Sequence, residues 1–256
     1  MGPGMSRDLT LAVVVLGLVT VAGLVLASAR ATTRIAPGRA VARGALQLGV
    51  VALVLRGALE YPALVVLVVL VMLGAVAVTS GRRLGGGRRV LDVLLCAAAG
   101  VAIPLTALLG SGALGRTALL TVAFAGILLG GTMTACTLTG RRLRALVTDR
   151  WDEVEGALAL GATERQAMAF FTGEVVREAT VPVLDQTRTT GLVTLPGAFV
   201  GALAGGASPA DAAKFQIAVL AGILCAQAVA SALLVRRLAV PVLRAGPAAA
   251  EVQRAP

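Results

Sequence analysis

The sequence predicts an all-α, polytopic membrane protein, and three observations lead to this fold class. Of the 256 residues, 57% are hydrophobic and only 14% are charged, which excludes an ordinary soluble domain. The apolar residues come in runs of about twenty, the length that crosses a bilayer core of ~30 Å. Basic residues fill the gaps between the runs. We therefore expect one transmembrane domain over residues 1–245, about seven membrane-spanning helices and a disordered tail over residues 246–256.

The expected spans follow one another along the chain. They are residues 9–29, 40–59, 63–79, 90–109, 117–139, 190–206 and 214–235. Positive charge lies behind the first run rather than in front of it, which favours a retained helix over a cleaved signal peptide. A turn at Glu60, Tyr61 and Pro62 separates the second and third runs, because proline begins a helix well and interrupts one badly. Whether the sixth run spans fully or is re-entrant stays open.

The distribution of basic residues gives the expected orientation. Arginines concentrate in residues 30–43, 82–89, 141–188 and 236–244, whereas the alternate loops hold few charges. The positive-inside rule then places the N-terminus outside and the C-terminus in the cytoplasm. The preference for arginine over lysine and the richness in alanine and valine indicate a GC-rich bacterial genome, so we expect a bacterial inner (plasma) membrane. A net charge of +10 also raises the possibility of nucleic-acid binding. We exclude nucleic acid as a partner because the arginines separate apolar runs and almost no aromatic residues accompany them.

Catalytic and metal-binding patterns are missing from the sequence. The chain has no histidine, and Cys96, Cys136 and Cys225 occur singly in three apolar runs, so we expect isolated buried thiols. The glycines at 85–87 precede arginine but lack the G-x-x-x-x-G-K-[ST] pattern of a nucleotide-binding loop. We expect no enzyme activity and no cofactor bound by this chain.

The segment from Asp152 onward is predicted to form a helix, a tight turn and a second helix. Val154, Ala157 and Leu158 recur at helical spacing, opposite an acidic face. Gly161 follows at a position where a helix commonly ends, because glycine adopts the left-handed backbone conformation found there without steric cost. A Thr163–Gln166 capping box should start the second helix, which we expect to end near Pro182.

This segment resembles the EAA loop of ABC-transporter permeases. The matching residues, which we take as candidates for ATPase coupling, are Glu155, Gly156, Ala157, Gly161 and Ala162, with Pro182 downstream. In those permeases the loop is a coupling helix that docks on a cytoplasmic ATPase. The resemblance implies a cytoplasmic coupling loop at about 141–189, with Glu155 meeting a basic or amide group of the partner.

Three further stretches are similar to the FetB-type permeases, a family of proposed iron exporters that includes plant aluminium-tolerance permeases. They are residues 131–135, 190–197 and 214–217. The resemblance implies two copies of the chain, each bound to an ABC ATP-binding subunit that holds ATP and Mg, and export of iron or another metal species. Residues 198–202 lack the methionines and the Gly-Gln pair of that family, which weakens iron as the cargo. The metal ligands are unknown, and a sugar nucleotide or other small solute is the alternative.

Polar or kinked positions within the runs are the candidates for the substrate pathway, because polar groups in lipid need a partner or a cavity. They are Gln47, Thr132, Met133, Thr134, Cys136, Pro196, Gly197 and Gln216. Met133 and Cys136 allow either a soft-metal contact or plain core packing, and Gly197, Gly201 and Gly205 have the spacing of close helix packing. Asp185 and Arg188 are expected to pair at the cytoplasmic membrane edge. The alternatives to an ABC permease are an ATP-independent channel or secondary carrier, and a scaffold without transport.

Overall fold

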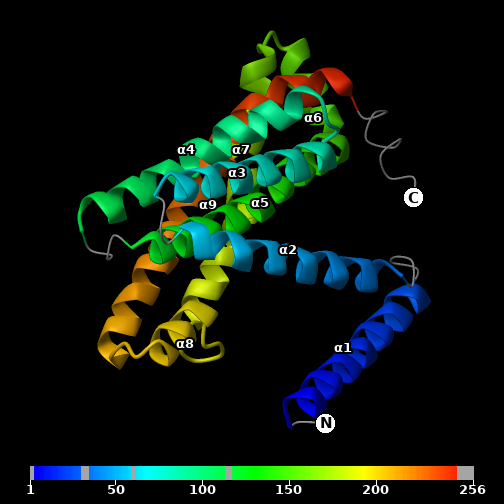
Figure 1. The fold of residues 1–256 in the computed structure, drawn as a ribbon. Helices are drawn as coiled ribbons and strands as arrows, with labels where there is room; N and C mark the ends of the chain where they lie inside the picture. Colours follow the sequence, from blue (N-terminus) through cyan, green and yellow to red (C-terminus); the bar gives the residue numbers. More distant parts are fainter. Residues whose placement is uncertain (1–2, 30–34, 59–61, 113–116, 247–256) are drawn as a thin grey trace. The chain divides into compact units, whose positions relative to one another are not determined.

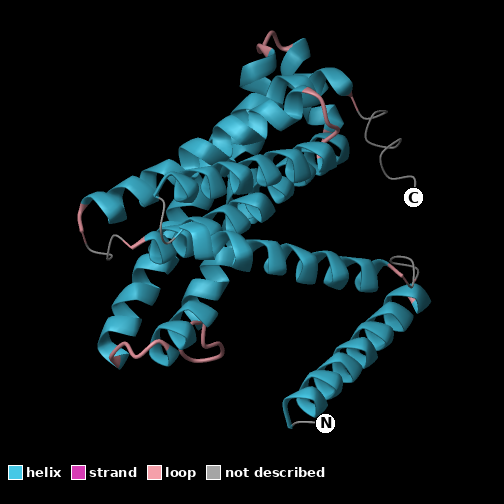
Figure 2. Cartoon of the chain, in the orientation of Figure 1, coloured by secondary structure: helices cyan, strands magenta, loops and turns pink. Residues whose placement is uncertain are grey.

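The computed structural model describes residues 3–29, 35–58, 62–112 and 117–246. Helices account for all the regular secondary structure in this part of the chain, apart from an isolated bridge between Thr190 and Thr194 (Figure 2). The protein is therefore an all-α, polytopic membrane protein, as predicted. Residues 30–34, the turn residues Glu60 and Tyr61, Arg116 and the predicted tail from residue 247 lie outside the described residues.

Contacts divide the chain into two units, Met1–Tyr61 and Pro62–Pro256. The first unit holds α1 (Pro3–Ser28) and α2 (Ala36–Ala58). The two helices approach each other closely where Gly38 faces Val19: a Cβ on this glycine would lie 3.7 Å from Val19 Cγ1. The single domain over residues 1–245 stays a prediction.

The second unit is a helical bundle built around two long helices (Figure 1). It contains α3 (Pro62–Arg83), α4 (Arg88–Gly110), α5 (Ala118–Asp149), α6 (Trp151–Ala159), α7 (Glu164–Thr189), α8 (Gly197–Ala204) and α9 (Pro209–Ala245). The fully buried side chains of Phe124, Leu128, Leu234 and Leu238 place α5 and α9 at its centre. At Gly100 of α4, an added Cβ would lie 2.5 Å from the carbonyl oxygen of Ala226, so only glycine allows α4 and α9 to approach this closely.

Five helices among the described residues are long and apolar enough to cross a membrane: α1, α3, α4, α5 and α9. Each coincides with a predicted span, and α5 continues ten residues past the predicted end at Thr139. The second predicted span is also helical, as α2. The total of seven spans and the outward N-terminus stay predictions.

Residues 190–206, the sixth expected run, do not form one continuous helix in the structure. This stretch contains a turn and then α8, whose 8 residues are about 12 Å long, far less than a bilayer core. The chain instead runs back along the bundle in α7, whose 26 residues are about 39 Å long (Figure 1). Consequently α6 and α8 lie at opposite ends of this unit, and α5, α7 and α9 alternate in direction.

Three of the predicted cytoplasmic arginine-rich segments meet at one end of the second unit. One cavity there is lined by Gly86 from the α3–α4 turn, by Arg144 near the end of α5 and by Val242 near the end of α9. We call this the basic end of the bundle, and α6 follows α5 there. This is the arrangement that the positive-inside rule requires of cytoplasmic loops.

Candidate functional site

The first helix of the predicted coupling segment is α6, at the basic end. Its apolar face packs inward: Val154 is fully buried, and Ala157 and Leu158 are half-buried against the core. Asp152 and Glu153 occupy its first turn, where the helix dipole favours negative charge. The predicted amphipathic helix is therefore confirmed.

The turn after α6 is a Schellman motif centred on Gly161. The amide of Ala162 donates to the carbonyl of Ala157 at 3.0 Å, and the amide of Gly161 donates to Leu158 at 2.9 Å. Gly161 adopts φ +90°, a conformation that L side chains rarely take. The predicted role of Gly161 as the residue that ends the helix is confirmed.

The second helix, α7, begins with the predicted capping box. The side-chain oxygen of Gln166 accepts from the amide of Thr163 at 2.8 Å, and the amide of Gln166 donates to the Thr163 hydroxyl at 3.3 Å. The predicted end near Pro182 is wrong, because α7 continues to Thr189 with this proline inside it. The buried stripe that includes Ala179 and Val183 continues past the point where proline removes one backbone hydrogen bond.

A chain of ion pairs ties α6 and α7 to the end of α5, and we call it the ion ladder. Arg142 donates to Glu178 at 2.8 Å and lies 3.8 Å from Glu174. Arg150, which links α5 to α6, reaches Glu174 at 3.4 Å and donates to Glu153 at 2.6 Å. The ladder therefore connects three helices through alternating charges. The sequence offered only a weak signal for it, the spacing of the two α7 glutamates by one helical turn.

Arg150 is the central group of the ion ladder. Its guanidinium carbon also lies 5.2 Å from the centroid of the Phe171 ring on α7. Hydrogen bonding to Arg150 lowers the pKa of the Glu153 carboxyl below its usual value. These contacts fix the orientation of α6 on the bundle by charge as well as by apolar packing.

The candidate coupling residues form one exposed surface beyond the bundle. Glu155 is exposed and accepts a hydrogen bond from the indole nitrogen of Trp151 at 2.7 Å. Gly156 and Gly161 are exposed beside it, whereas Ala157 and Ala162 are half-buried. The side chain of Leu160, which sequence reasoning missed, is 91% exposed at the tip of the turn. We call the exposed residues Glu155, Gly156, Leu160 and Gly161 the coupling surface.

The structure brings only part of the predicted pathway together. Thr132 and Cys136 are buried in α5, Met133 is half-buried and Thr134 is exposed. Gln216 is buried in α9, and neither its side-chain oxygen nor the Thr132 hydroxyl has a hydrogen-bond partner among the described residues. No group of three or more His, Cys, Asp or Glu side chains within the described ranges is placed to hold a metal ion.

Other candidate positions lie elsewhere. Gln47 is exposed on α2, in the first unit. Pro196 precedes α8 and Gly197 begins it, at the end opposite the basic end. A Cβ on Gly197 or Gly201 would meet nothing within 4 Å, so the close helix packing expected of these glycines is wrong within this chain.

The exposed face of α7 carries charged residues. Arg177, Asp185 and Arg188 are exposed on it, opposite the buried stripe. Asp185 and Arg188 pair at 3.6 Å as predicted, but they lie near the end of α7 away from α6, not at the edge next to the coupling segment. Such a face suits water or a protein partner rather than lipid.

Comparison with known proteins agrees with this architecture. The profile of an uncharacterised protein family, UPF0014, matches residues 9–241. The "UPF0014 membrane protein STAR2" of Oryza sativa subsp. japonica is 35% identical over 76% of this chain and 69% of its own length. The "Protein ALUMINUM SENSITIVE 3" of Arabidopsis thaliana is 36% identical over 70% of this chain and 67% of its own length. The "Probable iron export permease protein FetB" of Escherichia coli (strain K12) is 34% identical over 47% of this chain and 46% of its own length. No solved structure matches the chain.

Proposed function

The chain belongs to the UPF0014 family, and we propose that it is the membrane-spanning permease subunit of an ABC transporter. The observation that carries this proposal is the coupling surface on α6 and its turn. A Schellman motif and a capping box define it, and it stands at the basic end, where the positive-inside rule favours a cytoplasmic location. If the protein were an ATP-independent carrier or a scaffold, the coupling surface would have no role.

The coupling surface has the features of a small docking site. Glu155 offers a carboxylate to a basic or amide group, and Leu160 offers an apolar anchor that nothing in the described chain covers. The glycines on either side of Leu160 let a partner surface approach closely. We propose that a cytoplasmic ATP-binding subunit, which binds ATP and Mg, receives this surface in a groove.

The ion ladder would transmit movement from that partner to the bundle. A displacement of α6 pulls on Arg150, and through Glu174 and Arg142 on both α5 and α7. Because these helices run the length of the second unit, a tilt at the basic end also moves α8 at the far end (Figure 1). This is the rigid-body coupling that alternating access requires.

For the pathway, we propose that two copies of the chain place their α7 polar faces toward each other around an aqueous route. We propose that the exported cargo is iron or another metal species, as the name of the Escherichia coli relative favours. The metal would be a transient substrate. A sugar nucleotide or another small solute is the alternative cargo, and a bacterial inner membrane is the proposed location.

The decisive experiment measures ATP hydrolysis by the candidate ATP-binding subunit, with and without this permease in lipid nanodiscs, during titration with Fe(II). We expect permease-dependent hydrolysis that Glu155→Lys abolishes. The matched control is Asp149→Lys, the same charge change at an exposed position on the end of α5. Hydrolysis that ignores the permease would contradict the coupling proposal and favour an ATP-independent carrier. Stimulation by Fe(II) would support iron as the cargo.

A further inference from the structure

A groove at the basic end lies between the first turns of α7 and the last turns of α9. Two adjoining hollows form it, with volumes of about 700 Å³ and 460 Å³, and Arg165, Arg236 and Arg237 line both. Glu164 and Arg244 line the larger hollow, whereas the described residues around the smaller one include no carboxylate. We call the two hollows together the α7–α9 groove.

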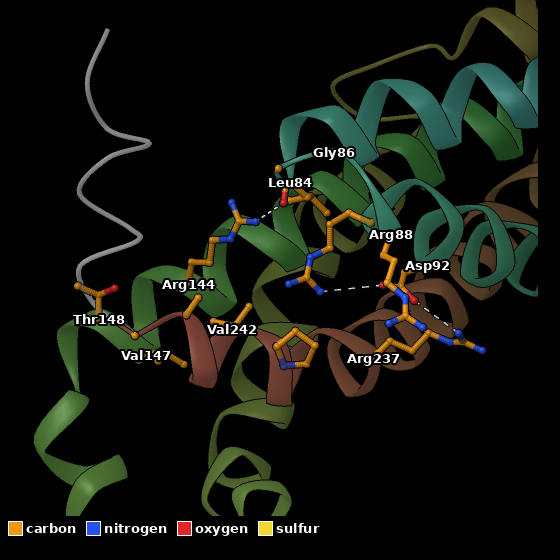
Figure 3. Close-up of a pocket in the computed structure, with 14 residues that line it drawn as sticks. Leu84, Gly86, Arg88, Asp92, Arg144, Val147, Thr148, Arg237 and Val242 are labelled. Atoms are coloured by element: carbon orange, nitrogen blue, oxygen red, sulfur yellow. Dashed lines mark hydrogen bonds and ion pairs between the residues drawn. The ribbon is translucent and has the colours of Figure 1, made fainter.

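Two of the four arginines in the groove are neutralised by acidic neighbours. Arg244 lies 2.9 Å from the carboxylate of Glu164, which begins α7. Arg237 points toward Asp92 of α4, 3.5 Å away (Figure 3). These pairs use the nearby carboxylates and leave none for the remaining arginines.

The other two arginines, Arg165 and Arg236, carry charge that nothing in the described chain offsets. Both are exposed, and neither forms an ion pair or a side-chain hydrogen bond with a described residue. On the flank of α7 that packs against α5, arginines of α5 face Glu174 and Glu178 in the ion ladder. On the flank toward α9, Arg165 instead shares both hollows with Arg236. Like charges repel, so an anion between these two arginines would replace repulsion with attraction.

The groove lies at the depth expected for lipid headgroups. Arg236 directly follows the last predicted apolar run, residues 214–235, and Leu233, one turn earlier on α9, is exposed as a lipid-facing side chain would be. Ala169 and Thr172 of α7 line the groove beside Arg236, so its wall there consists of small side chains. The two unpaired arginines therefore stand where the acyl region gives way to the cytoplasm.

We propose that the α7–α9 groove binds the phosphate of an anionic lipid headgroup. Guanidinium groups hold phosphate oxygens through paired, charge-assisted hydrogen bonds, and Arg165 and Arg236 come from different helices, so one phosphate can bridge α7 and α9. A basic pocket between membrane helices on the cytoplasmic side is a setting in which lipid headgroups bind. The bound lipid would hold the second helix of the coupling segment against α9. This proposal rests on the cytoplasmic placement of the basic end and not on transport activity.

Native mass spectrometry of the full chain tests the proposal. The chain is released from nanodiscs that contain equal amounts of phosphatidylcholine and phosphatidylglycerol, and the lipids it retains are counted. We expect preferential retention of phosphatidylglycerol, whose headgroup carries a net negative charge. If inorganic phosphate displaces this lipid, while chloride at the same ionic strength does not, the groove binds a free anion and the lipid assignment is wrong.

Variants connect the retained lipid to the groove. Arg165→Gln and Arg236→Gln should each weaken phosphatidylglycerol binding about fivefold, the effect of about 1 kcal/mol per arginine. Both should keep the circular dichroism spectrum of wild type, because neither side chain is paired within the described chain. The matched control, Arg177→Gln, removes another exposed arginine of α7 that does not line the groove, and should retain the lipid like wild type.

Two results would overturn the proposal. One is equal retention of the two lipids by wild type, or retention of phosphatidylglycerol that is as high in Arg165→Gln and Arg236→Gln as in the control. The other is a pair of groove variants that keep the lipid but lose binding to the candidate ATP-binding subunit. The second result would assign the groove to acidic side chains of a partner protein.

Discussion

Alanine substitution at two glycines of the coupling surface should change the stability of α6 in opposite directions. Gly161 has φ +90° and Gly156 lies inside α6, yet a Cβ at either position would meet nothing within 4 Å. Steric overlap therefore plays no part, and backbone conformation alone decides the outcome. Gly161→Ala forces an L side chain into a left-handed conformation, whereas Gly156→Ala replaces a poor helix former with the best one.

The expected magnitudes follow from these two causes. A left-handed L-residue costs about 1–2 kcal/mol, which would raise the equilibrium for local opening of the turn about tenfold. Glycine to alanine inside a helix gains about 1 kcal/mol, which would lower the same equilibrium about fivefold. The two variants should thus differ from wild type in opposite directions by amounts that amide exchange resolves.

Hydrogen–deuterium exchange of the full chain in lipid nanodiscs provides the measurement. The informative amides are those of Gly161 and Ala162, which close the Schellman motif on the carbonyls of Leu158 and Ala157. Faster exchange in Gly161→Ala and slower exchange in Gly156→Ala are expected. The reasoning fails if Gly161→Ala leaves both amides as protected as in wild type, or if the two variants move together.

Three further predictions use other contacts. Arg142→Gln breaks the ion ladder at its link to two α7 glutamates and should lower Tm by about 3 °C in thermal unfolding, the equivalent of about 1 kcal/mol. Because hydrogen bonding to Arg150 lowers the folded-state pKa of Glu153, this contact stabilises the fold above the unfolded-state pKa and loses its effect as pH falls through the folded-state value. The Tm difference between wild type and Glu153→Gln should therefore shrink in acid; a constant difference would argue against the contact. Gly100→Ala forces α4 from α9 and should cost about 1–3 kcal/mol in chemical unfolding, whereas Gly74→Ala, with open space around it, should not.

The sequence predicted the local features of the coupling segment well because their chemistry is local. The Schellman motif joins residues no more than five apart, and the capping box joins Thr163 to Gln166. Each depends on the identity of one or two side chains, so the pattern alone is informative. The exposed Leu160 escaped notice because exposure of an apolar side chain is a property of the whole surface.

The errors arose where packing over long distances decides the structure. Pro182 was read as a helix end, but the buried stripe of α7 on α5 and α9 stabilises the helix across it. Residues 190–206 were predicted to be one apolar run, but the stretch begins with a turn at Gly191, where φ is +86°, and forms only the short helix α8. The partners in the ion ladder, Arg142 and Glu178, are 36 residues apart, a separation with no sequence signature.

The basic end also shows that two sets of arginines differ in how their charge is used. In the ion ladder, Arg142 and Arg150 alternate with glutamates, so that helices are tied together and little charge is left over. Elsewhere at the basic end, Arg89 and Arg237 pair with one carboxylate, Asp92. The positive-inside rule requires only that arginines lie on one side of the membrane, and scattered surface residues such as Arg83 satisfy it.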